Sequence, residues 1–88
     1  MVNTQTIYEK ELQSIKTWDE IQGSEAVHCK ANSYQFITTA GHGYLVVPMD
    51  DKYIRTAKDI VAYGFVGEHA VYLEEDCEMP EFLKDVNR

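Results

Sequence analysis

The chain has 88 residues and a net charge of −7, with 44% apolar and 26% charged residue types. This length and balance predict one globular domain over residues 1–88 and exclude an intrinsically disordered chain. The excess of acids disfavours direct binding to nucleic acid or to an anionic membrane, because both need contacts from lysine and arginine.

The N-terminal segment and the cysteines predict a cytoplasmic protein. Residues 1–6 contain no basic stretch followed by an apolar one, so no secretory signal is expected. The longest apolar run, Tyr44 to Met49, is far shorter than the roughly 20 residues that a membrane-spanning helix needs. Cys29 and Cys77 are too few for a disulfide framework, so we expect reduced thiols.

Residues 6–22 are predicted to form an amphipathic helix. Thr6 and Glu9 have the spacing of a capping box, and Gly23 is expected to end the helix in the left-handed conformation. Apolar residues recur at steps of three and four, which indicates one buried face. That face comprises Tyr8, Leu12, Ile15, Trp18 and Ile21, and the expected outer face comprises Glu9, Lys10, Gln13 and Lys16.

Residues 26–48 are predicted to form sheet. A short strand is expected at 26–30, and the segments 34–39 and 44–47 are rich in the aromatic and β-branched residues that strands favour. Residues 41–43 (Gly-His-Gly) predict a turn that joins the last two strands into a hairpin. Pro48 is expected to end the second of them, since proline has no N–H to donate.

The remaining elements follow Pro48. A helix is expected to begin at Asp50 or Asp51, to run to Tyr63 and to stop at Gly64. Residues 65–66 and 70–73 predict a second hairpin, and Pro80 to Val86 predict a closing helix. This order of elements predicts an α+β fold in which two to three helices pack on one face of a small antiparallel sheet.

His42 is a candidate functional residue because it lies between two glycines at a predicted loop tip. The position suits a general base, a metal ligand or a contact residue, and equally a plain turn residue. One alternative is a small hydrolase or metal-dependent enzyme in which His42 acts with Glu75 or Cys77. The acids around Cys77 are expected to raise its pKa, which opposes a nucleophilic role.

Several acids, cysteines and histidines of the chain are of residue types that bind metal ions. Glu75 and Asp76 are chemically suited to bind magnesium but have no supporting spacing. The cysteines and histidines lack the close pairs that are typical of zinc sites, and we expect no metal and no cofactor. The four residues of such a zinc set would be Cys29, His42, His69 and Cys77.

The segment from Glu74 to Asp85 contains six acids and one lysine. It is either a solvated rim or a surface that contacts a basic partner, where complementary charge speeds encounter and sets orientation. In the second case we expect two tyrosines to anchor the partner and a histidine to contact it as well. The expected partner-binding residues are Glu74, Glu75, Asp76, Glu78, Glu81, Tyr72, Tyr44 and His42.

The patterns from Thr38 to Pro48 and from Tyr72 to Cys77 resemble an uncharacterised small-domain family of phage and mobile-element proteins. The resemblance covers about residues 34–83, and it departs from the family at Leu73 and at the Gly43–Tyr44 pair. The family offers no activity to transfer, but it implies a phage or mobile-element origin.

Small acidic proteins of that origin often inhibit a host machine, as anti-CRISPR and anti-restriction inhibitors do. We therefore expect this protein to bind and inhibit a basic, nucleic-acid-handling host protein. A homodimeric structural or assembly module is the other alternative.

Overall fold

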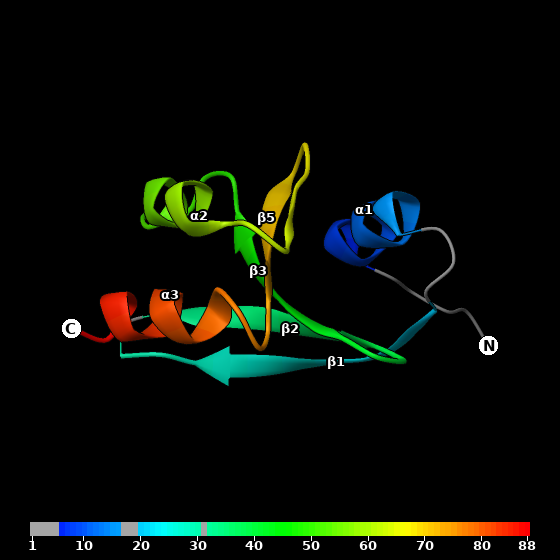
Figure 1. Ribbon diagram of the computed structural model, residues 1–88, viewed down its shortest axis with the longest axis horizontal. Helices are drawn as coiled ribbons and strands as arrows, with labels where there is room; N and C mark the ends of the chain where they lie inside the picture. Colours follow the sequence, from blue (N-terminus) through cyan, green and yellow to red (C-terminus); the bar gives the residue numbers. More distant parts are fainter. Residues whose placement is uncertain (1–5, 17–19, 31) are drawn as a thin grey trace.

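The computed structural model describes residues 6–16, 20–30 and 32–88, which form three helices and five strands (Figure 1). The helices are α1 (Ile7–Ile15), α2 (Ile54–Ile60) and α3 (Met79–Val86). The strands are β1 (Ile21–His28), β2 (Ser33–Thr39), β3 (Gly43–Pro48), β4 (Phe65–Val66) and β5 (Ala70–Glu74). In this part of the chain, no helix combines the length and the apolar character needed to cross a bilayer.

The strands form one antiparallel sheet in the order β1-β2-β3-β5-β4. β3 lies at its centre, with Leu45 opposite Phe36 of β2 on one side and opposite Leu73 of β5 on the other. The predicted hairpins β2–β3 and β4–β5 are both confirmed. Antiparallel neighbours need only a short turn between them, so glycine-containing loops of few residues are enough.

The central strands are buried on both faces of the sheet. Successive residues of a strand point to opposite sides, so Leu45 packs in one core with Phe82 of α3, while Tyr44 packs in the other with Leu12 of α1. Figure 1 shows α2 and α3 side by side and α1 apart from them. The predicted α+β class is confirmed and two helices share a face, but α1 covers the opposite face. The reason is that the side chains of the apolar run Tyr44–Val47 point to both faces of β3, so both faces must be covered from water.

The first helix is shorter than predicted. α1 ends at Ile15 and β1 already begins at Ile21, so the prediction of helix as far as residue 22 is wrong. Gly23, expected to stop the helix, lies in β1 at a shift in the register with β2. A Cβ at position 23 would lie 3.1 Å from Thr38 Oγ1, so glycine permits the close pairing. Trp18, expected on the buried face, lies outside the described residues.

The predicted capping box begins α1. Thr6 Oγ1 accepts a hydrogen bond from the Glu9 backbone N–H at 3.1 Å, and the Glu9 carboxylate accepts one from the Thr6 backbone N–H at 2.8 Å. These bonds satisfy two donors that the first helical turn leaves without partners. Glu9 is therefore buried, which corrects its expected place on the outer face.

The second helix, α2, is shorter at both ends than the predicted helix. Asp51 holds the turn before it, because its Oδ2 accepts hydrogen bonds from the Tyr53 backbone N–H at 2.9 Å and from the Tyr34 hydroxyl at 3.0 Å. The carboxylate thus joins this turn to β2 instead of capping the helix.

Gly64 has a steric role that differs from the predicted one. No glycine in the described ranges adopts the left-handed backbone conformation, so Gly64 does not stop α2 in the expected way. A Cβ at position 64 would overlap the carbonyl oxygen of Tyr72 on β5. The absence of a side chain therefore lets the segment before β4 lie directly against β5.

We expect Gly64→Ala to lower the free energy of unfolding by about 2–3 kcal/mol, because the added methyl group meets backbone that cannot move independently of β5. Gly41→Ala is the matched control, since a Cβ there meets no atom within 4 Å. The control is expected to change stability by less than about 0.5 kcal/mol. Urea unfolding followed by circular dichroism measures both, and equal stabilities of the two variants would contradict the close approach at Gly64.

Candidate functional site

The two segments that the sequence singles out meet at one end of the sheet. Tyr44, near the start of β3, lies opposite Glu74 at the end of β5. The backbone N–H of Glu75 donates a hydrogen bond to the carbonyl oxygen of Gly43 at 2.9 Å. The β2–β3 turn and the turn that follows β5 are therefore neighbours, and we call residues 40–43 and 74–78 together the loop end.

Glu74 shapes the turn at residues 75–78. Its Oε1 accepts a hydrogen bond from the Asp76 backbone N–H, and its Oε2 accepts one from the Cys77 thiol, both at 3.1 Å. The bonds from Asp76 and Cys77 lower the pKa of Glu74, although burial acts in the opposite direction. Glu74 is 9% exposed, so its carboxylate holds the turn and does not offer a partner the contact expected from the sequence.

The Cys77 thiol is exposed but weakly reactive. Its hydrogen bond to Glu74 raises the pKa of the thiol to about 11, with smaller contributions from desolvation and from the surrounding acids. The expected upward shift is thus confirmed. A thiol that stays protonated near neutral pH is a poor nucleophile, which argues against an enzyme that uses Cys77 with His42.

Glu78 is the second buried carboxylate of the loop end, with 3% of its surface exposed. Its Oε1 accepts a hydrogen bond from the Gly64 backbone N–H at 2.8 Å, whereas Oε2 has no hydrogen-bond partner among the described residues. Glu78 therefore joins the turn to the segment before β4, and it is not part of an exposed contact surface as the sequence predicted.

Lys16 is buried against Tyr44, the residue that follows Gly43 of the loop end, although the sequence predicts it on the outer face of the first helix. It is 8% exposed, and its Nζ donates a hydrogen bond to the Tyr44 hydroxyl at 2.8 Å. Nζ also lies 5.3 Å from the centroid of the Tyr44 ring and 5.7 Å from that of Phe65, within the range of cation–π attraction. The predicted role of Tyr44 as a surface anchor is therefore wrong, since its ring is buried.

Tyr72, the other expected anchor, is fully buried on β5. Its hydroxyl donates a 2.6 Å hydrogen bond to the carboxylate of Glu11 on α1. Burial, and then this bond, raise the pKa of Tyr72 above its usual value. The ring therefore ties α1 to the sheet, and because it is buried it is not part of the exposed contact surface at the loop end.

The exposed members of the predicted set all lie on the loop end or just after it. No described cation contacts the carboxylate of Glu75 or that of Asp76, whereas Glu81 shares a shallow groove with Lys84 and Arg88. The loop end thus presents two adjacent exposed acids on one turn and an exposed histidine on the neighbouring turn. The exposed residues are His42, Glu75, Asp76 and Glu81.

The cysteines and histidines of the possible zinc set are divided between the two ends of the sheet. His42 and Cys77 belong to the loop end, whereas His69 precedes Ala70, which pairs with Pro48 at the other end of β3. Over residues 6–16, 20–30 and 32–88, no three metal-ligating side chains gather into a possible site. The geometry therefore does not favour the metal-dependent alternative.

The hydrogen bond between Glu74 and Cys77 predicts a measurable thiol titration. In a Cys29→Ser background, the rate of alkylation by iodoacetamide is expected to rise with pH to an inflection at about 11. Glu74→Gln removes the negative charge that disfavours the thiolate, so the inflection is expected to move towards the usual value of 9.0. The same inflection in both proteins would contradict the contact.

The lowered pKa of Glu74 also predicts a pH dependence of stability. A carboxyl group whose pKa is lower in the folded state contributes stability above its ordinary value of 4.5 and loses that contribution as the pH falls through the folded value. We expect the wild type to lose more stability than Glu74→Gln between about pH 5 and pH 2. Urea unfolding at a series of pH values measures the difference, and parallel curves would refute it.

No protein-family model, no curated protein and no solved structure matches this chain.

Proposed function

We propose that this protein acts by stoichiometric binding of a partner with a basic surface, and that it contacts this partner through the loop end. Glu75 and Asp76 supply the central charges, with His42 on the neighbouring turn and Glu81 at the start of α3. We further propose that the partner is a host protein that handles nucleic acid, and that occupation of its basic surface inhibits it.

The observation that carries this proposal is the pair of exposed carboxylates on a turn that buried groups hold in place. Glu74 and Glu78 lie on either side of Glu75 and Asp76 in the chain, and both are hydrogen-bonded inside the protein. A turn held in this way loses little conformational freedom on binding. Because no described cation neutralises Glu75 or Asp76, both remain available to arginine or lysine of a partner.

Charge supports the choice of partner class. Carboxylates form charge-assisted hydrogen bonds with the same arginine and lysine side chains that bind phosphate. A net charge of −7 also attracts a basic protein over a distance and speeds its encounter. We propose in addition that the protein has the phage or mobile-element origin implied by the patterns from Thr38 to Pro48 and from Tyr72 to Cys77, and this origin directs the proposal to a host protein whose basic surface normally contacts nucleic acid.

A homodimeric assembly module is the second candidate. Among the described strands β1 pairs with β2 alone, so one edge of this eight-residue strand is open for pairing with another chain. Glu25 is exposed in the middle of the strand, and a charge at that place opposes such pairing. A monomer in sedimentation equilibrium at about 100 μM would exclude this candidate as the main function.

The proposal is tested by charge reversal at the loop end. We expect the variant Glu75→Lys/Asp76→Lys/Glu81→Lys to capture at least about tenfold less of the basic nucleic-acid-binding proteins that the immobilised wild type captures from bacterial lysate. Quantitative mass spectrometry measures the captured amounts. Added duplex DNA and high salt are both expected to release the partner from the wild type.

The matched control reverses three exposed acids elsewhere, Glu25, Asp50 and Asp59, and has the same net charge as the test variant. This control is expected to retain the partner, because the charge reversals weaken only the long-range attraction between the two proteins and leave the loop end unchanged. Thermal unfolding by circular dichroism establishes that both variants fold. Equal loss of the partner in both variants would show that net charge alone, and not the loop end, determines binding. Undiminished capture by the test variant would refute the proposed surface.

A further inference from the structure

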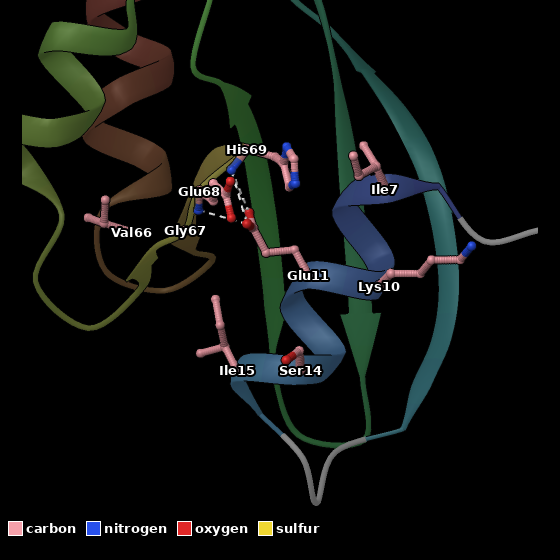
Figure 2. Close-up of a pocket in the computed structure, with 9 residues that line it drawn as sticks. All are labelled: Ile7, Lys10, Glu11, Ser14, Ile15, Val66, Gly67, Glu68 and His69. Carbon is pink, nitrogen blue, oxygen red and sulfur yellow. Dashed lines mark hydrogen bonds between the residues drawn. The ribbon is translucent and has the colours of Figure 1, made fainter.

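A second site lies at the opposite end of β5, where the turn at residues 67–69 binds a carboxylate of the protein itself. The Glu11 carboxylate accepts hydrogen bonds from the backbone N–H of Glu68 at 2.7 Å and from that of His69 at 3.0 and 3.1 Å. Figure 2 shows this carboxylate reaching from α1 to the turn, with both N–H groups directed at it. A third donor, the Tyr72 hydroxyl, lies 2.6 Å from Glu11 Oε1.

The turn is shaped to bring these donors together. Gly67 donates its N–H to the Ala70 carbonyl oxygen of β5, and the His69 carbonyl oxygen accepts the N–H of Met49, the residue that follows β3, so both sides of the turn are held in place. The next two N–H groups are left pointing outwards, an arrangement that binds anions well. A Cβ on Gly67 would overlap the Glu11 carboxylate, so glycine at this position keeps the space for the anion open.

The donors favour an ionised ligand. Burial tends to raise the pKa of Glu11, but the hydrogen bonds from Tyr72, His69 and Glu68 outweigh it and lower the pKa below its usual value. Hydrogen bonds to an ionised acceptor are stronger than those between neutral groups. The site therefore selects a carboxylate over a neutral amide.

The site opens on a surface groove of about 460 Å³ between α1 and the 66–69 segment (Figure 2). Glu68 and His69 are exposed, and Glu11 is half-buried. Apolar side chains of the same groove remain open to water, since Ile7 is 50% and Val66 57% exposed. A ligand in this groove would thus meet donors for a carboxylate and, next to them, apolar side chains.

We infer that the 67–69 turn and the Tyr72 hydroxyl form a carboxylate-binding site, which Glu11 occupies in this structure and which a carboxylate ligand occupies when Glu11 is displaced. Free small carboxylates and acidic side chains of peptides share this chemistry. The apolar groove beside the donors favours the acidic side chain of a peptide. The site is separate from the loop end and does not depend on its proposed function.

The test removes the internal ligand and supplies one from solution. The backbone N–H resonances of Glu68 and His69 are followed by NMR in the full chain carrying Glu11→Ala, while sodium acetate replaces sodium chloride at constant ionic strength. We expect saturable shifts of both resonances towards their wild-type positions. The wild type is expected to bind acetate at least about tenfold more weakly, because Glu11 competes at a high local concentration.

Gly67→Ala in the Glu11→Ala background is the matched control, because its methyl group fills the space of the carboxylate. It is expected to abolish the acetate response. Equal acetate responses in the two variants, or none in Glu11→Ala, would overturn the inference. If Glu11→Ala does not fold in chloride, refolding by acetate becomes the measurement, and failure to refold at any acetate concentration tested counts against the site.

Capped tripeptides separate the two sources of the carboxylate. The peptide Ile-Glu-Ile is expected to bind Glu11→Ala at least about tenfold more tightly than acetate, because its apolar residues reach the groove. Equal affinities would instead assign the site to free small carboxylates. Binding of Ile-Gln-Ile as tight as that of Ile-Glu-Ile would overturn the inference, because the site would then not recognise the charge.

Discussion

Burial of β3 and β5 on both faces is the constraint on which the rest of the structure depends. Since the side chains of these strands alternate between two cores, each face needs its own cover, α1 on one and α2 with α3 on the other. Little of either strand's surface is then left for contact with a ligand. Exposed polar groups gather instead in the turns at the two strand ends, and both sites proposed for this protein lie there.

Buried and half-buried carboxylates hold these turns in place. Glu11, Glu74 and Glu78 each accept at least one hydrogen bond from the backbone N–H of a turn or loop residue. Such N–H groups need acceptors wherever the chain leaves regular secondary structure, and one carboxylate provides two oxygens for them. The formal charge of −7 therefore overstates the acidity offered to a partner, because part of it supports the fold.

The two ends of β5 have opposite chemical preferences. The loop end presents exposed carboxylates, whereas the 67–69 turn presents hydrogen-bond donors that already hold one. Charge reversal at Glu75 and Asp76 leaves the donors of the second site unchanged, and Glu11→Ala leaves the loop end unchanged. The two sites can therefore be tested separately, and failure at one does not weaken the case for the other.

Local spacing in the sequence was enough to predict the capping box at Thr6, both hairpins, the closing helix and the raised pKa of Cys77, since each depends on residues a few positions apart.

Spacing in the sequence did not predict the contacts that join distant segments. Lys16 and Tyr44 are 28 positions apart, and Glu11 and Tyr72 are 61 apart. Helical periodicity does not show that α1 ends before Ile21. Nor does it show that Glu11 of α1 and Lys16 just after it reach inwards to the hydroxyls of buried tyrosines. Only the packing of α1 on the sheet decides which polar side chains are buried and bonded, and hence which acids remain on the surface.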